Sequence, residues 1–265
     1  MGLKMVVADV DGTLLDWRHV VDDRVKFLVK RVAEQGRVFT LATGRIFASA
    51  RQVAKQAGVV HPIIANGGAL IGTPDGRELW TMPLSRRVAL DILRNTVPCP
   101  GARYAFVHDT IYTDTPGEHV QTYEAALGVR VCIVSDLADV LDDDPTQVVL
   151  RVPVDEAPAL ADALSRSYAR RAKVIRSLPH LIEFLHPEAS KGTALVRLCR
   201  ILGIDLEEVL AIGDGESDLD MLSVAGMGAM VANAPEPLKS FARYVSRAPF
   251  ADGVAEAIDH FSASD

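Results

Sequence analysis

The sequence predicts an α/β fold in which a parallel sheet with helices on its faces is interrupted by a separate α+β unit. Two observations lead to this prediction. Apolar runs typical of buried strands alternate with helical segments at both ends of the 265-residue chain. In the middle the alternation stops, and a helix followed by two adjacent strands occurs twice, near the beginning and the end of that region.

The N-terminal region contains the first part of the predicted parallel sheet. Apolar runs indicate strands at 5–8, 38–42 and 63–65, and helical spacing of apolar residues indicates helices at about 21–35 and 47–57. Because a β-α-β-α-β order brings every strand back in the same direction, we expect these three strands to lie parallel in one sheet.

The middle of the chain is predicted to form a mostly antiparallel sheet with its own helices. The expected helices lie around 88–93, at 118–127 and at 155–168, and the expected strands at 103–107, 111–114, 129–134, 148–152, 172–176 and 181–185.

Strand and helix alternate again in the last part of the chain. A helix at 192–202 precedes a buried strand at 209–212, and a helix from about Leu219 precedes a strand at 228–232. We therefore expect a discontinuous, Rossmann-like α/β core of residues 1–83 and 188–265. Residues 84–187 would be an inserted α+β cap domain.

Composition narrows the class of protein. The chain is 49% hydrophobic and 24% charged, which is enough for a real core, and its formal net charge of −7 argues against a nucleic-acid partner. The three cysteines, Cys99, Cys132 and Cys199, have no paired spacing that would indicate disulfides or zinc. No apolar run could span a bilayer and no leader is visible, so we expect a cytoplasmic monomer or homodimer without a membrane partner.

Two carboxylates follow the first strand. Asp9 and Asp11 stand directly after the apolar run 5–8, and Gly12 then allows a turn. A strand followed by an acidic turn would be the simplest interpretation. However, the end of a strand is also the usual ligand position in an open α/β sheet, so the two acids are expected to converge there.

Other strands of the predicted core end in polar residues too. Thr43-Gly44-Arg45 follows the second strand, and Asp214 and Asp218 follow a later one. Because parallel strands place their carboxyl ends on one edge, at least four carboxylates would gather and repel one another. A hard divalent cation relieves this repulsion, and Mg²⁺ suits carboxylates together with a phosphate.

Hydrogen-bond donors and one cation are expected at the same edge. Thr43 and the backbone N–H of Gly44 can donate to an anion. Lys191 lies at the start of a helix, between Ser190 and Gly192, and adds a positive charge close to the positive end of the helix dipole. Acids, a divalent metal and a few donors are typical of a phosphoryl-transfer site.

The four motifs resemble those of the haloacid dehalogenase superfamily. Asp9-x-Asp11-Gly12-Thr13, the Thr43 motif, Lys191 and Gly213-Asp214-x-x-x-Asp218 occur in that order, and the insertion after the second motif is similar to the α+β cap of the Cof-type phosphatase branch. The resemblance covers nearly the whole chain. The second aspartate, Asp11, fits phosphoryl transfer, since dehalogenases of the superfamily lack it.

The resemblance implies a role for each acid. Asp9 would be the nucleophile that attacks phosphorus and becomes an aspartyl-phosphate. Asp11 would protonate the leaving oxygen and then activate water. Asp9, the backbone carbonyl of Asp11 and Asp214 would hold Mg²⁺, and Asp218 would be a further residue of the metal site that orients Lys191 or a water there.

The resemblance also implies the groups that bind the phosphoryl oxygens, namely Thr43, Gly44 and Lys191. Ser217 stands where the family usually has asparagine, so this part of the phosphate and metal shell is expected to differ. Arg45 and Asn66 follow predicted strands on loops and are candidates for lining the substrate pocket.

The expected function is therefore that of a Mg²⁺-dependent phosphatase. Its substrate would be a small phosphorylated metabolite, such as a sugar phosphate or a similar monoester. A phosphomutase that uses the same Asp9 is an alternative. A non-catalytic protein that binds a phosphorylated metabolite is a further alternative, suggested by Ser217.

Overall fold

The computed structural model describes residues 2–263, which form two compact units. The first draws its described residues from Met1–Thr43, Ala50–Trp80 and Ser190–Asp265. The second consists of Gly44–Ser49 and Thr81–Ala189. Each unit has its own sheet and its own hydrophobic cluster.

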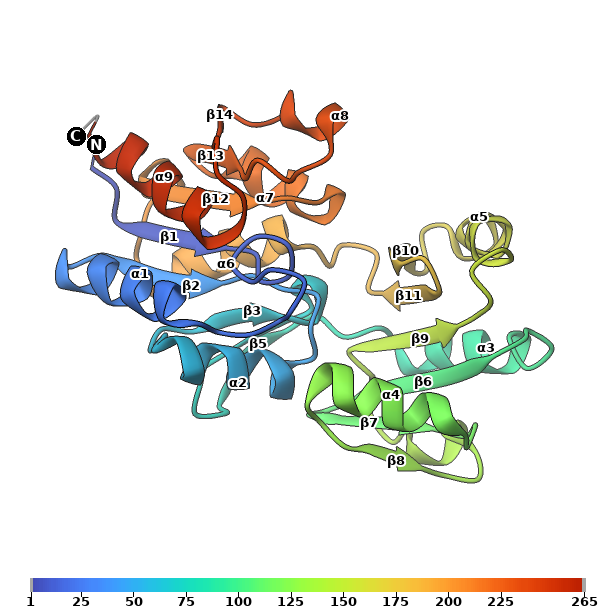
Figure 1. Cartoon of the computed structure of the whole chain (residues 1–265). Helices are drawn as coiled ribbons and strands as arrows, with labels where there is room; N and C mark the ends of the chain where they lie inside the picture. Colours follow the sequence, from blue (N-terminus) through green and yellow to red (C-terminus); the bar gives the residue numbers. More distant parts are fainter. Residues whose placement is uncertain (1, 264–265) are drawn as a thin grey trace. The chain divides into compact units, whose positions relative to one another are not determined.

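The first unit is built on a five-stranded parallel sheet with β1 next to its centre (Figure 1). β1 pairs with β12 on one side and with β2 on the other, so that Ala8 lies in register with both Ile212 and Leu41. The residues that follow these three strands therefore meet at one edge of the sheet. In spatial order the strands are β14 (Tyr244–Val245), β13 (Met227–Met230), β12 (Val209–Gly213), β1 (Met5–Ala8) and β2 (Val38–Leu41).

Helices cover this sheet and bury its apolar residues. Ala194 and Leu195 of α6 pack with Met5, Val7 and Ala211 of the strands. Helix α1 begins at its N-cap Asp22, whose carboxylate accepts hydrogen bonds from two backbone N–H groups of the first turn. The helices are α1 (Asp23–Glu34), α2 (Phe47–Ala57), α6 (Lys191–Leu202), α7 (Leu219–Val224), α8 (Glu236–Lys239) and α9 (Phe250–Ser262), with short 3-10 turns at η1 (Asn66–Gly68), η3 (Leu206–Glu208) and η4 (Glu216–Asp218).

The third predicted strand is not part of the parallel sheet. β3 (Ile63–Ala65) instead pairs antiparallel with β4 (Leu70–Gly72), and β5 (Glu78–Thr81) completes a separate three-stranded sheet. The turn after β3 reverses the chain at once, because Asn66 and Gly67 adopt left-handed backbone angles. An isolated parallel bridge between Ala42 and Ile64, together with the hydrogen bond from the Thr43 N–H to the Ile64 carbonyl, ties β3 to the end of β2.

The second unit is the predicted α+β structure with a mostly antiparallel sheet. Of its strand pairs, β7 and β8 run parallel and the others are antiparallel. α3 (Arg86–Asn95) and α5 (Ala157–Tyr168) contribute to one hydrophobic cluster, and α4 (Glu118–Leu127) to another. The strand order is β10 (Lys173–Leu178), β11 (Leu181–Leu185), β9 (Gln147–Arg151), β6 (Ala102–Val107), β7 (Thr110–Thr113) and β8 (Val131–Ile133), and a 3-10 turn, η2 (Leu137–Val140), precedes β9.

None of the helices in residues 2–263 combines the length and the apolar character needed to cross a bilayer.

Candidate active site

Asp9 occupies the first position after β1 and is buried. Its backbone N–H donates to the carbonyl of Ile212 at 2.9 Å, which continues the β1–β12 ladder and fixes the acid at the sheet edge. Its Oδ1 accepts a hydrogen bond from the ammonium of Lys191 at 2.6 Å. Within the described residues, the second oxygen of Asp9 accepts no hydrogen bond.

Lys191 is the buried cation of this site. It is the first residue of α6, which begins at the N-cap Ser190, whose hydroxyl accepts from the backbone N–H of Thr193. Its side chain is only 3% exposed, and Nζ lies 2.6 Å from both Asp9 Oδ1 and Asp218 Oδ1. Burial alone would lower the pKa of Lys191, but the two carboxylates outweigh it and raise the pKa. The ammonium is therefore charged at neutral pH.

Asp218 is held on both sides of its carboxylate. While Oδ1 accepts from Lys191, Oδ2 accepts from the backbone N–H groups of Asp214 and Gly215, at 3.0 Å each. The side chain lies so close to Gly213 that a Cβ there would come within 2.4 Å of the Asp218 Cβ. Glycine at 213 therefore allows Asp218 to close the turn after β12.

Asp214 is tied to the loop after β1. Its Oδ1 accepts a hydrogen bond from the Thr13 hydroxyl at 2.7 Å. Gly12, with φ of 89°, passes so close that a Cβ at this position would lie 2.4 Å from Asp214 Oδ2. The two loops that carry the acids thus fit together only because residue 12 is glycine.

Burial and neighbouring carboxylates both oppose ionisation of Asp9 and Asp214. Burial raises the pKa of Asp9, the Lys191 ammonium opposes this, and the carboxylates of Asp218 and Asp214 raise it further. Burial also raises the pKa of Asp214, against the lowering effect of the Thr13 hydrogen bond. A bound divalent cation would favour the charged form of both groups.

The donor set fits a hard divalent metal. Oxygens of Asp9, Asp214 and Asp218 lie within 4.8 Å of one another. In the part of the chain that the structure describes, one oxygen of Asp9 and one of Asp214 accept no hydrogen bond, whereas both oxygens of Asp218 are engaged. Asp9 and Asp214 therefore have the ligand atoms that a cation such as Mg²⁺ prefers.

Asp11 lies apart from this group. Although it is two residues after Asp9, its Oδ1 lies 2.8 Å from Nδ1 of His19. Its side chain is 37% exposed, whereas that of Asp9 is 9% exposed. The two acids of the first motif thus have different environments, one dry and bonded to a lysine, the other wetter and bonded to a histidine.

The remaining predicted residues are distributed around the strand ends. Thr43 is buried, its backbone N–H donates to the carbonyl of Ile64 at 3.0 Å, and its own carbonyl accepts from Gly67 at 3.1 Å. Asn66 is fully buried with φ of 51°. Gly44 and Ser217 are exposed, and Arg45 is half-buried. Gly44 and Arg45 belong by contact to the second unit, in whose cluster the adjacent Ile46 is buried.

The chain is similar to a known family of hydrolases. Residues 6–258 match the sequence profile of the haloacid dehalogenase-like hydrolases, which includes all four motifs. The chain belongs to this family. Enzymes of this family generally use a divalent metal, and the carboxylate group of Asp9, Asp214 and Asp218 could bind one.

Similar proteins in the family include phosphatases. The 5-amino-6-(5-phospho-D-ribitylamino)uracil phosphatase YitU of Bacillus subtilis is 25% identical, with 97% of each chain covered. The HMP-PP phosphatase of Cronobacter sakazakii is 28% identical over 85% of this chain and 83% of its own. The structure of a haloacid dehalogenase-like hydrolase from Bacteroides thetaiotaomicron superposes with a TM-score of 0.87 at 25% identity, covering 97% of this chain and 99% of that one. The chain is accordingly a hydrolase of the phosphatase class.

Side chains that contact the site but were not predicted as site residues include those of Thr13, His19 and Asn233. Thr13 binds Asp214 and His19 contacts Asp11, as described above. Asn233 donates to the carbonyl of Gly12 at 2.7 Å and accepts from the backbone N–H of Phe250 at 3.1 Å. Thr13 was recognisable as part of the first motif. The other two lie outside all four motifs, and no local pattern marks them.

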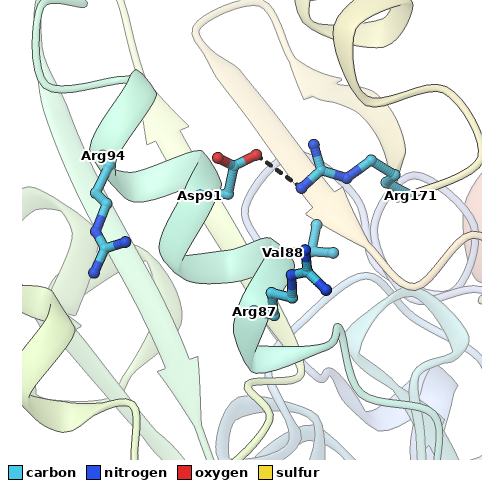
Figure 2. A pocket seen from close by; sticks show the side chains of 5 residues that line it. All are labelled: Arg87, Val88, Asp91, Arg94 and Arg171. Carbon is cyan, nitrogen blue, oxygen red and sulfur yellow. Dashed lines mark hydrogen bonds and ion pairs between the residues drawn. The ribbon is translucent and has the colours of Figure 1, made fainter.

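A cavity of about 570 Å³ lies in the second unit of the hydrolase, and none of its lining residues is a predicted site residue (Figure 2). Arg171 reaches Asp91 of α3 from another segment, with 2.8 Å between Nη2 and Oδ2. The guanidinium of Arg171 also lies over the ring of Tyr168. Arg87, Val88 and Arg94 complete the lining.

Proposed function

We propose that the protein is a Mg²⁺-dependent phosphatase that hydrolyses a small phosphorylated metabolite through an aspartyl-phosphate on Asp9. The observation that carries this proposal is the environment of Asp9. Its carboxylate is buried and bonded to the Lys191 ammonium through one oxygen, while the other oxygen accepts no hydrogen bond from the described residues. With two oxygens, of which only one is bonded to Lys191, the carboxylate can offer one oxygen to the metal and one to phosphorus.

In the first step, an oxygen of Asp9 forms a bond to phosphorus and the bond to the leaving oxygen breaks. Asp11 gives its proton to that oxygen. In the second step, Asp11 takes a proton from water, whose oxygen forms a bond to phosphorus as the bond between phosphorus and the Asp9 oxygen breaks, which releases phosphate and restores the carboxylate. Lys191, Thr43 and the backbone N–H of Gly44 bind the phosphoryl oxygens, and the ammonium offsets the charge that develops on them.

Asp9, Asp214 and the backbone carbonyl of Asp11 would hold Mg²⁺, which when bound offsets the negative charge of the phosphoryl group and of the acids. We assign Asp218 a different part from that of a ligand. Because both of its oxygens are engaged, by Lys191 and by two backbone N–H groups, it is suited to fix the position of the lysine.

The division of labour between the domains is part of the proposal. Residues 1–83 and 188–265 would supply the chemistry, and residues 84–187 would act as a cap that selects the substrate. Arg45, Asn66 and Ser217 are proposed contacts to the part of the substrate beyond the phosphoryl group. We expect the enzyme to act in the cytoplasm.

The test is a screen of phosphorylated metabolites with Mg²⁺ that measures released phosphate. The panel should include sugar phosphates and the substrates named for the two relatives, 5-amino-6-(5-phospho-D-ribitylamino)uracil and HMP-PP. We expect one class of monoester to be preferred and activity to vanish in excess chelator. Transfer of the phosphoryl group to a second metabolite without phosphate release would indicate a mutase instead. Full activity in chelator would exclude the metal.

A further inference from the structure

His19 is placed against the proposed acid and base of the reaction. Its Nδ1 lies 2.8 Å from Oδ1 of Asp11, eight residues earlier in the chain. The imidazole is 57% exposed and the Asp11 side chain 37% exposed, so both groups are accessible to solvent and to a substrate.

The backbone of His19 has an uncommon conformation. With φ of 54°, His19 adopts the left-handed conformation, which is uncommon for residues other than glycine. The turn that imposes it is held by Asp16, whose carbonyl accepts from the His19 N–H at 2.9 Å. The Asp16 carboxylate also accepts from the backbone N–H and the guanidinium of Arg18. The residue with this uncommon backbone conformation is thus the one whose side chain contacts Asp11.

We propose that His19 is a positioning residue that orients Asp11 for proton transfer to the leaving group. This inference rests on the proposed function, in which Asp11 is the acid and base. Nδ1–H of His19 donates to Oδ1 of Asp11, and Oδ2 of Asp11 carries the proton that is transferred.

The bond from Asp9 oxygen to phosphorus forms, the bond from phosphorus to the leaving oxygen breaks, and the Oδ2 proton of Asp11 moves to the leaving oxygen. His19 keeps its proton throughout. Its hydrogen bond strengthens as Asp11 becomes a carboxylate, because a bond to a charged acceptor is stronger than one to a neutral acceptor. The bond therefore favours the transition state over the ground state.

The chemistry of the leaving group separates this role from a purely structural one. An alkoxide is a poor leaving group and needs the proton, whereas p-nitrophenolate leaves without it. Loss of His19 should therefore lower kcat/KM for alkyl phosphates much more than for p-nitrophenyl phosphate. A hydrogen bond that only stabilises the turn would affect both kinds of substrate equally.

The experiment measures kcat/KM for alkyl and aryl phosphates with Mg²⁺ in the full chain. His19→Gly removes the imidazole and tolerates the left-handed backbone, and His19→Leu is a second variant with a bulky apolar side chain. We expect a loss of about 10- to 100-fold on alkyl phosphates, in keeping with a charge-assisted hydrogen bond, and little change on p-nitrophenyl phosphate. In His19→Asn, the amide N–H can replace Nδ1–H, and asparagine tolerates the left-handed backbone conformation at this position. This variant should therefore retain much of the wild-type activity on alkyl phosphates.

Val20→Ala is the matched control, because Val20 is the exposed neighbour of His19 and should leave both substrates unaffected. Asp11→Asn is measured in parallel. If Asp11→Asn shows no dependence on the leaving group, the proposed role of Asp11 fails. If Asp11→Asn shows that dependence while the His19 variants match the wild type, or lose activity equally on both substrates, the inference about His19 is wrong.

Discussion

At the scale of single residues, the site is governed by charge balance in a dry environment. Lys191 is the cation at the centre, with Asp9 and Asp218 each 2.6 Å away. All three side chains are less than 10% exposed, so water contributes little to the solvation of their charges. Each charge depends on the others, because an unpaired buried ion costs several kcal/mol.

Asp9→Asn should abolish phosphate release while the protein remains folded. The amide has nearly the shape of the carboxylate and can still accept from Lys191, but it cannot attack phosphorus. Steady-state phosphate release on the best substrate is the measurement, and circular dichroism verifies the fold. Release close to the wild-type rate would mean that no covalent intermediate forms on Asp9.

Lys191→Met should lower the free energy of unfolding by about 3–5 kcal/mol in the absence of metal, since it leaves two buried carboxylates without their cation. Urea unfolding of the variant and the wild type measures the difference. Lys239→Met is a suitable control, because Lys239 pairs with the exposed Glu236 and should change stability by less than about 1 kcal/mol. Equal stabilities of the Lys191 variant and the wild type would show that the acids are already neutral.

At the scale of elements, strand ends and short turns decide where functional groups lie. Lys191 lies in the first turn of α6, and Asp218 lies in the short η4 turn after β12.

The second unit also contains a buried acidic side chain, in β11. Glu183 lies in the interior of that strand, bonded to the Ser177 hydroxyl of β10, and burial raises its pKa, only partly offset by that bond.

Glu183→Gln should remove a pH dependence of the local stability of β11. Because the folded pKa lies above the unfolded one, the native state holds the proton more tightly. The stability contributed by the neutral acid is therefore complete below about pH 4.5 and is lost as the pH rises towards and through the folded pKa. Hydrogen exchange of β11 amides at about pH 5 and about pH 8 measures this loss. We expect faster exchange at the higher pH, after correction for intrinsic rates, in the wild type only. If exchange in the variant increases by the same amount after this correction, another titrating group causes the pH dependence.

At the scale of the whole molecule, the chain is divided into two compact units with separate sheets and cores. The described acids of the candidate metal site, together with Lys191, all belong to the first unit. Segment 44–49, which begins with Gly44 and Arg45 of the second motif, belongs to the second unit. The second motif is thus divided between the units, whereas the other three motifs lie in the first unit.

Replacing residues 84–187 by a short linker should separate chemistry from selectivity. We expect a core that still binds Mg²⁺, with a flattened preference among phosphorylated metabolites and the largest fall in kcat/KM for the best substrate. Calorimetric titration with Mg²⁺ and the metabolite screen are the measurements. An unchanged substrate ranking at unchanged rates would show that the cap does not select the substrate. The circular dichroism spectrum of the core is the control for folding.

The sequence alone determined the parallel core and most of the element order, because apolar periodicity and strand-end acids are local patterns. The helix 47–57, for example, has the predicted bounds. The sequence also supplied the motif order that pointed to the hydrolase family. It did not indicate β4, β5, α8, β14 or α9. Tertiary structure decided what distant segments do together. β3 lies outside the five-stranded parallel sheet, because the left-handed turn at Asn66 allows it to pair antiparallel with β4. The contact of His19 with Asp11 and the engagement of both Asp218 oxygens depend on how loops meet in space, and no spacing in the sequence encodes such distances.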